Sequence, residues 1–256
     1  MLITGASSGV GEATALEVAR RGARVLLVAR RASELARVEG IITGFGGAAA
    51  SYACDLTDPE SVDALVAAVG PVDYLVNNAG RSIRRSLDLS YDRFHDVERT
   101  MAINYFGPVR LTMGLLPGMR SRGFGHVVNI VTWGVTLKAP KFSAYIASKT
   151  ALDAWSRVVA RETYADHVTF TNVRLDLVQT PMTQPTEAYR GRGRTPEQAA
   201  AMVVRALEDR PLTVSTLVGW AGQVGEIVAP GLMERAFALA AVRMKDSKAA
   251  RGMSEE

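Results

Sequence analysis

Short runs rich in valine, isoleucine and leucine alternate with helical stretches along most of the chain. The runs lie at Arg24–Ala29, Ala48–Ala53, Val72–Val76, His126–Val131 and His167–Val173. Most of them lack polar alternation, which is typical of strands buried on both faces of a parallel sheet. Segments with helical character lie between them, at roughly 10–21, 32–43, 59–69, 92–120 and 143–165. This alternation predicts an α/β fold with a doubly wound parallel sheet.

Glycines concentrate between the first apolar run and the first helical stretch, in Thr4-Gly5-Ala6-Ser7-Ser8-Gly9-Val10-Gly11. Gly5 permits a tight turn, Gly9 leaves room for a pyrophosphate, and Gly11 allows the helix to pack closely on the strand. Free N–H groups at the start of the helix also favour phosphates. A flexible turn would be glycine-rich too, and the spacing is not G-x-G-x-x-G. The strand-to-helix position nevertheless favours the nucleotide loop of a Rossmann fold.

Composition excludes several classes of protein. The chain has 256 residues, 48% of them hydrophobic and 22% charged, which excludes a disordered chain. The single cysteine excludes an internal disulfide framework, and the net charge of +4 is too small to argue for nucleic acid. We see no linker, so we expect residues 1–256 to form a single domain. There is no targeting signal and no transmembrane run, so we expect a cytoplasmic protein.

The apolar run that precedes Gly5 is unusually short. Only Met1, Leu2, Ile3 and Thr4 precede Gly5, and the apolar run among them has three residues. A buried strand usually has about five. Either a late start or excision from a longer chain would explain this feature.

Two arginines, Arg30 and Arg31, follow the second predicted strand. Many NAD sites place an acid here for the ribose 2′-hydroxyl, whereas guanidinium groups suit the additional phosphate of NADP. The pair favours NADP(H), with Arg30 as the main contact, although a solvated basic start of a helix would look the same. Asp55 and Leu56 follow the third strand. Asp55 either accepts a hydrogen bond from the adenine amino group or serves as a turn acid.

Tyr145 and Lys149 stand four residues apart near the start of a long predicted helix. Residues at this spacing share one face of a helix, and a lysine cation beside a phenol lowers the pKa of the tyrosine. A tyrosine adjusted in this way can act as a general acid or base near neutral pH. The pair is common by chance, and it gains meaning from the glycine loop in the same chain.

These motifs belong to a larger set in a fixed order. The chain carries TGASSGVG at 4–11, Asn77-Asn78-Ala79-Gly80, Asn104 in MAINYFG, VVNIVTWG at 127–134 and YIASK at 145–149. As a set they resemble the short-chain dehydrogenase/reductase family. The resemblance implies an NADP(H)-dependent oxidoreductase that acts on a small-molecule carbonyl or alcohol. It implies that Tyr145 is the general acid–base catalyst, that Lys149 lowers its pKa and holds the nicotinamide ribose, and that Asn104 positions a water.

The loop, the arginines and the resemblance give a set of expected cofactor contacts, and the apolar residues near the hydroxyls give a set of expected substrate contacts. The cofactor set is Gly5, Ser7, Ser8, Gly9, Val10, Gly11, Arg30, Arg31, Asp55, Leu56, Asn78, Ala79, Gly80, Tyr145, Lys149, Val178, Thr180 and Met182. The substrate set is Thr132, Trp133, Val135, Leu137, Phe142 and Met182, half of which would fit a core equally well. Hydride transfer needs no metal, and the histidines stand singly, so we expect no metal site.

Two positions depart from the family pattern. Thr132 stands 13 residues before Tyr145, where the family usually has serine. Threonine keeps a hydroxyl that can hydrogen-bond a substrate carbonyl, but its methyl makes the side chain stiffer and bulkier. Asp176 follows the sixth strand, where the family commonly has Pro-Gly, and it either lies near the nicotinamide or caps a turn. We expect a working site with a lower rate or a narrower substrate range.

Other segments resemble one bacterial subgroup of the family. They are NNAGRSIRRS at 77–86, SYDRFHDVERTM at 90–101, TPMTQPT at 180–186 and MKDSKAARG at 244–252. Members of the subgroup occur alone or as the C-terminal reductase domain of fatty acyl reductases, which implies long-chain or acyl-derived carbonyls. A 3-oxoacyl-thioester or steroid-type ketoreductase and an NADP(H)-binding regulatory protein are alternatives. Arg81, Arg84 and Arg85 either meet coenzyme A or phosphopantetheine phosphates or form a solvated face.

Two later segments belong to the expected substrate side. The polar stretch at 183–196 is rich in glycine, proline and arginine and is typical of a mobile loop. Within 210–256, an apolar region with few charges would close over the pocket, pair subunits or touch a membrane surface. The predicted helices at 92–120 and 143–165 are the family's usual subunit interface, which implies a homodimer or homotetramer.

Overall fold

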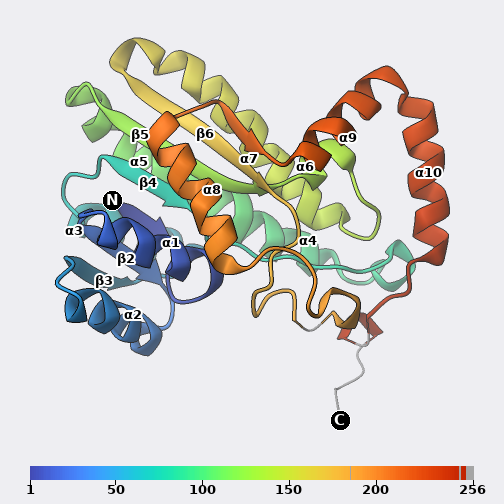
Figure 1. Cartoon of the computed structure of the whole chain (residues 1–256), viewed down its shortest axis with the longest axis horizontal. Helices are drawn as coiled ribbons and strands as arrows, with labels where there is room; N and C mark the ends of the chain where they lie inside the picture. Colours follow the sequence, from blue (N-terminus) through green and yellow to red (C-terminus); the bar gives the residue numbers. More distant parts are fainter. Residues whose placement is uncertain (185, 248, 252–256) are drawn as a thin grey trace.

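Parallel strands form the centre of the protein. The computed structural model describes residues 1–184, 186–247 and 249–251. Within these residues one seven-stranded sheet has the order β3-β2-β1-β4-β5-β6-β7, with every neighbouring pair parallel (Figure 1). The strands are β1 (Leu2–Thr4), β2 (Val25–Ala29), β3 (Ala49–Ala53), β4 (Tyr74–Asn77), β5 (Gly125–Thr132), β6 (Val168–Leu175) and β7 (Thr213–Ser215). The order reverses between β1 and β4, which confirms the predicted doubly wound Rossmann topology.

Helices cover both faces of this sheet. One face packs against α1 (Gly9–Arg20), α2 (Ala32–Gly44) and α8 (Pro196–Asp209), and the other against α3 (Pro59–Ala68), α5 (Gly107–Ser121) and α7 (Ser143–Glu162). Neighbouring side chains of β2 enter different clusters, because Leu26 packs on the α3 side and Leu27 on the α1 side. This two-sided burial explains why the apolar run lacks polar alternation.

The helical stretch predicted at 92–120 is confirmed, but it contains a wider turn that the prediction missed. The structure contains α4 (Phe94–Met101), a π-helical turn at Ala102–Phe106 and then α5. Pro108 has no N–H, so it cannot donate the usual helical hydrogen bond to the carbonyl four residues earlier, at Asn104. Such sites favour a wider turn. Because the whole stretch has helical character, the hydrophobic periodicity of the sequence does not reveal this π-helical turn.

Several short elements complete the chain. They are α6 (Gly134–Leu137), α9 (Leu217–Val228), α10 (Pro230–Arg243) and 3₁₀ turns at Leu87–Leu89, Tyr164–Asp166, Glu187–Tyr189 and Ala249–Arg251. Among the described residues, no helix is both long enough and apolar enough to cross a membrane.

Three asparagines form a hydrogen-bonded row across the middle of the sheet. Asn77, Asn129 and Asn172 occupy matching positions of β4, β5 and β6. The Asn77 amide donates to Asn129 Oδ1 at 2.9 Å, and the Asn129 amide donates to Asn172 Oδ1 at 3.1 Å. All three are buried, so these bonds offset part of the cost of burying the amides, and among the described residues Asn77 Oδ1 has no hydrogen-bond partner.

Residues 217–246, which we name the C-terminal strap, leave the body and return to it (Figure 1). Near its first end, a Cβ on Gly222 of α9 would lie 2.3 Å from the Leu137 side chain, so glycine is needed for this contact with α6. At the other end, Lys141 Nζ donates to the Asp246 carboxylate at 3.0 Å, and the Ser86 N–H donates to the same carboxylate at 2.9 Å. Both ends of the strap are therefore attached.

Candidate active site

One cleft of about 830 Å³ lies at the carboxyl ends of the strands. Its walls come from the glycine loop after β1, the turn after β4, the end of β5, the start of α7 and the segment after β6. Ligands of doubly wound sheets bind at this edge, beside the point where the strand order reverses. The topology therefore brings together motifs that are far apart in the sequence.

The glycine loop has the shape expected of a nucleotide loop. Gly5 and Gly9 have φ angles of +66° and +58°, which favour glycine. A Cβ on Gly11 would lie 2.3 Å from the carbonyl oxygen of Gly5, so the helix can approach this turn only with glycine there. Gly5 and Gly9 line the cleft with Ser7, Ser8 and Val10, whereas Gly11 does not. The backbone thus leaves room for a phosphate against the start of α1.

Thr4 fastens the turn after β4 to this loop. Its hydroxyl accepts the N–H groups of Asn78 and Ala79, each at 3.0 Å, while the Asn78 amide donates to the carbonyl of Thr4 at 2.9 Å. Asn78, Ala79 and Gly80 all line the cleft, as expected. The sequence analysis missed Thr4, although a hydroxyl directly before a glycine loop is a usable signal.

Asn104 is fully buried in the π-helical turn. Its Oδ1 accepts the N–H of Arg81 at 2.9 Å, and its amide donates to the Arg81 carbonyl at 2.8 Å and to Ser148 Oγ at 3.0 Å. The side chain is outside the cleft lining, and it holds the cleft wall in place. Ser148 is another residue that the sequence analysis missed. The expected role of Asn104 in positioning a water remains a prediction.

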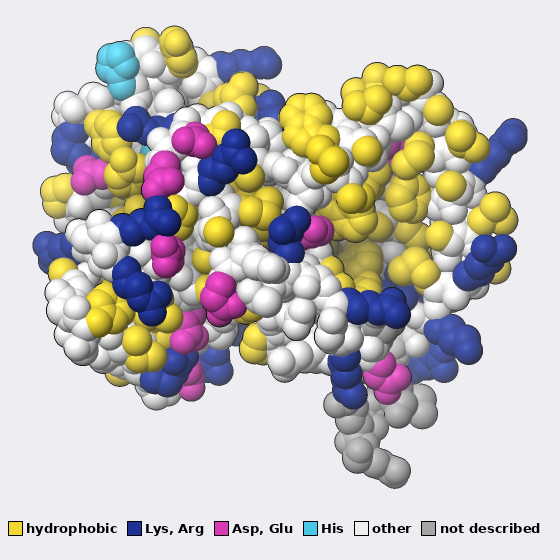
Figure 2. Space-filling view, viewed as in Figure 1, with side chains coloured by type: hydrophobic (Ala, Val, Ile, Leu, Met, Phe, Trp, Pro, Cys, Tyr) yellow, Lys and Arg dark blue, Asp and Glu magenta, His cyan; other side chains and the backbone are white. Residues whose placement is uncertain are grey.

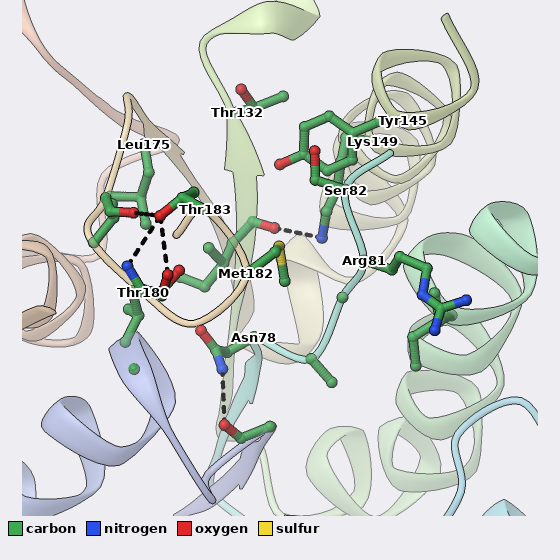
Figure 3. Close-up of a pocket in the computed structure, with 18 of the residues that line it drawn as sticks. Asn78, Arg81, Ser82, Thr132, Tyr145, Lys149, Leu175, Thr180, Met182 and Thr183 are labelled. Atoms are coloured by element: carbon green, nitrogen blue, oxygen red, sulfur yellow. Dashed lines mark hydrogen bonds between the residues drawn. The ribbon is translucent and has the colours of Figure 1, made fainter. Parts of the chain in front are cut away.

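Thr132, Tyr145 and Lys149 lie together in the cleft, as expected (Figure 3). Thr132 ends β5, and its hydroxyl accepts the Gly134 N–H at 3.1 Å. Tyr145 and Lys149 come from the first turns of α7, where their spacing places them on one face. Lys149 Nζ donates to the carbonyl of Ile130 at 2.8 Å, so the ammonium group is held at a fixed point of β5.

Burial controls the ionisation of this pair. Burial raises the pKa of Tyr145 to about 12, and the neighbouring Thr132 hydroxyl only partly counters it. Burial also lowers the pKa of Lys149 to about 8. The expectation that Lys149 lowers the pKa of the phenol remains a prediction, because the causes that act on Tyr145 in this structure are its burial and the Thr132 hydroxyl. At neutral pH the phenol is protonated and Lys149 is still mostly charged.

Arg30 and Arg31 are exposed and line the nucleotide end of the cleft, together with Leu56. Asp55 is not part of this lining. Its carboxylate accepts the backbone N–H of Thr57 at 2.9 Å and the Thr57 hydroxyl at 2.8 Å, which fits the turn-acid alternative. Burial raises the pKa of Asp55, but the Thr57 bonds and the charge of Arg30 outweigh it and hold the pKa below its usual value.

The three arginines after the Asn78 turn separate in space. Arg85 forms an ion pair with buried Asp96, so neither a phosphate contact nor a solvated face describes it correctly. Arg84 donates to the carbonyl of Lys245 at 2.7 Å, which ties it to the strap. Arg81 lines the cleft, and its guanidinium points away from Tyr145 (Figure 3).

The apolar end of the cleft matches the expected substrate pocket in part. Thr132, Trp133, Phe142 and Met182 line it, and Val135 and Leu137 do not. Leu137 is buried against α9, so it is a core residue, as the sequence analysis allowed, and not part of the substrate pocket. The structure adds Ser82, Tyr189 and Met244, which come from loops and the strap. No sequence pattern marks these three residues.

The segment after β6 is attached beside the cleft. Asp176 pairs with Arg194 at 2.9 Å, and Val178 forms an isolated β-bridge with Arg194. Asp176 also lines the cleft, so its place fits both alternatives, an acid near the nicotinamide and an acid that fastens the turn. Val178, Thr180 and Met182 line the cleft, and Thr183 donates to the carbonyl of Val178 at 2.7 Å (Figure 3). The expected mobility of residues 183–196 remains a prediction, and residue 185 lies outside the described residues.

The residues present fit a dinucleotide cofactor. The glycine loop provides a cradle that a Cβ would disturb, because a Cβ on Gly9 would lie 3.0 Å from the Thr180 methyl. Two guanidinium groups lie at the nucleotide end of the cleft, and the buried ammonium of Lys149 lines the same cleft. Among residues 1–184, 186–247 and 249–251, no cluster of histidine, cysteine, aspartate and glutamate could hold a metal ion.

Known proteins share this arrangement. The sequence pattern of the short chain dehydrogenase family matches residues 1–191. The chain belongs to this family. It is therefore an oxidoreductase that acts on C=O or CH–OH groups.

The relatives include fatty acyl reductases. An uncharacterized oxidoreductase of Mycobacterium tuberculosis is 46% identical over 264 residues, covering 100% of this chain and 77% of the relative. A fatty acyl-CoA reductase of Acinetobacter baylyi is 44% identical over 260 residues, covering 100% and 88%. The crystal structure of an actinorhodin polyketide ketoreductase with NADPH has a TM-score of 0.77 and 28% identity, covering 84% of this chain and 94% of the other.

Proposed function

We propose that this protein is an NADPH-dependent reductase of long-chain or acyl-derived carbonyls. The observation that carries the proposal is the convergence of Thr132, Tyr145 and Lys149 where the nucleotide end of the cleft meets an apolar wall. The similarity to a fatty acyl-CoA reductase supports an apolar acyl-derived substrate. Trp133, Phe142 and Met182 would contact it.

The arginines after β2 support NADPH as the cofactor. Arg30 and Arg31 stand where an acid would select NAD, and guanidinium groups suit the 2′-phosphate. The similar ketoreductase, whose crystal structure contains NADPH, points the same way. When bound, the cofactor supplies the hydride.

The protein's own residues prepare the carbonyl and supply the proton. The Thr132 hydroxyl already accepts the Gly134 N–H, so its own proton is available to a substrate oxygen. The raised pKa of Tyr145 keeps its phenol protonated, which suits a proton donor in reduction. Lys149 is held by Ile130 and places a cation beside the reaction, which stabilises the phenolate left behind.

An aldehyde and ketone panel tests the proposal directly. Purified full chain should consume NADPH with aldehydes, and kcat/KM should rise with chain length. Tyr145→Phe should lower kcat about 10²- to 10⁴-fold while NADPH binding persists, because it removes the proton donor alone. Tight NADPH binding without turnover on any carbonyl would favour the regulatory alternative. A preference for 3-oxoacyl thioesters or steroids over simple aldehydes would favour those reductases.

We also propose that the protein assembles through α4, α5 and α7. Large apolar side chains on these helices and on the π-helical turn between α4 and α5 are more than half exposed, namely Phe94, Phe106, Met113 and Val158. Exposed apolar patches of this kind mark protein interfaces. Sedimentation of the full chain should give the mass of a dimer or tetramer, and a monomer at micromolar concentration would contradict the proposal.

A further inference from the structure

Helix α10 carries an apolar stripe that the body does not cover. None of its side chains is buried. The half-buried positions are Met233, Phe237, Ala240 and Ala241, and Met244 continues the row just beyond the helix. Their spacing places them on one face. The opposite face is exposed and carries Leu239, which is 62% exposed.

The half-buried face of α10 borders a hollow between the strap and the body. At the start of the stripe Met233 packs on α9, where a Cβ on Gly225 would lie 3.3 Å from its Sδ. Figure 2 shows the surface hollowed beside α10, with hydrophobic side chains lining the hollow. The hollow continues the catalytic cleft, because Met244 at the end of the stripe lines that cleft. At the other end of the strap, a Cβ on Gly219 would lie 3.7 Å from the Cβ of Trp133, which also lines the cleft.

The side chains that line the hollow indicate which class of ligand it would bind. The stripe contains no charged or hydrogen-bonding side chain. The acid of α9, Glu226, is turned to the body and pairs with Lys138 at 3.6 Å. From Met233 to Met244 the stripe extends about 16 Å along a helix. A narrow apolar strip of this length, open to the cleft at one end, suits an unbranched alkyl chain.

We infer that the inner face of α10, through Met233, Phe237 and Met244, binds the alkyl chain of the substrate while its carbonyl lies at Tyr145. This inference rests on the proposed function, and it adds the site that determines the preference for the length of the substrate's alkyl chain. Each buried methylene should raise kcat/KM about fourfold until the hollow is filled. The strap thereby selects long chains over short ones.

A pair of variants on opposite faces of α10 tests the inference. Phe237→Gln places an amide on the inner face, and Leu239→Gln makes the same change on the outer face of the same helix. The measurement is the ratio of kcat/KM for dodecanal to kcat/KM for butanal. The ratio should fall tenfold or more in Phe237→Gln and stay within about twofold in Leu239→Gln, because one buried amide opposes several buried methylenes.

A second variant and a binding assay complete the test. Phe237→Trp should shift the best chain length toward shorter aldehydes, because the larger ring fills part of the hollow. Calorimetric titration with 1-dodecanol should show binding that Phe237→Gln weakens about tenfold. This assay needs no turnover, so it separates the inference from the proposed reaction.

The outcomes distinguish the two claims. If 1-dodecanol binds through Phe237 but no carbonyl is reduced, the proposed function is overturned and the alkyl site stands. If aldehydes are reduced with no dependence on chain length, the alkyl site is overturned and the reductase stands. Equal effects of Phe237→Gln and Leu239→Gln also overturn the site. A loss confined to Leu239→Gln would do the same and would point to a lipid surface on the outer face.

Discussion

The two ends of the cleft are built in different ways. At the nucleotide end the backbone sets the shape, and a Cβ on Gly11 would nearly meet the carbonyl of Gly5. At the substrate end, the strap touches the body at its two attachments, and a Cβ on Gly231 would meet nothing within 4 Å. The first end accepts one ligand shape. The second end tolerates substitutions in the strap. Substitutions there can therefore alter substrate specificity without disturbing the cofactor site.

Matched glycine substitutions give the largest expected difference between the two ends. Gly11→Ala should lower the free energy of unfolding by about 3 kcal/mol, because the new methyl overpacks a backbone contact. Gly231→Ala should be neutral or stabilise by up to about 1 kcal/mol, because alanine favours the helix and finds open space. Urea unfolding of both variants measures this. Similar losses in both would remove the contrast.

The second effect concerns charge at the nucleotide end. Arg30→Ala should raise the Kd for NADPH roughly 10- to 100-fold and leave the Kd for NADH nearly unchanged, because a charge-assisted hydrogen bond to the 2′-phosphate is lost. Fluorescence titration with both cofactors measures the Kd values. Arg31→Ala is the matched control and should have the smaller effect. Equal loss for NADPH and NADH would show that Arg30 does not read the phosphate.

The third expected effect is a dependence of NADPH affinity on pH. The pKa of Lys149 is lowered to about 8, so its cation is lost as pH rises through that value. NADPH affinity should therefore fall by up to tenfold per pH unit above about 8, and Lys149→Met should bind weakly with a flat profile over this range. The same shift acts on stability in the opposite direction. The unfolded chain holds this proton up to the ordinary lysine pKa, so the contribution of Lys149 to stability rises with pH between the two values.

The smallest effect belongs to the hydroxyl at the end of β5. Thr132→Ser should change kcat/KM less than about fivefold, because the hydroxyl that orients the carbonyl is kept. Thr132→Ala removes that hydroxyl and should cost about 10²-fold. Steady-state kinetics with one aldehyde compares the two variants. A larger loss in the serine variant than in the alanine variant would show that the methyl, and not the hydroxyl, matters here.

The sequence predicted the part of the molecule where local rules operate. The unbroken apolar runs indicated the parallel sheet. The spacing of Tyr145 and Lys149 placed them on one helical face, and the family resemblance assigned their roles. The π-helical turn was missed because helical periodicity continues on both sides of Pro108. The short strand β7 was missed because three residues show no usable period.

Contacts between distant segments were beyond sequence reasoning. Arg85 looked like one of three equivalent arginines, and only the fold brings it to Asp96. Met244 lies far from the other cleft residues in the sequence and reaches them by the path of the strap. The effect of burial on the pKa of Tyr145 was also beyond sequence reasoning, because that burial depends on every element around the cleft.

The asparagine row across β4, β5 and β6 has a consequence for how the sheet assembles. Apolar strands can slide past one another with little change in their contacts, whereas Asn77, Asn129 and Asn172 bond to each other only in one alignment. A slip of one residue would turn each amide to the opposite face and leave it without a partner. The row therefore specifies the register of β4, β5 and β6 during folding. Its removal should be seen less in the stability of the finished protein than in the fraction of chains that reach it without misfolding.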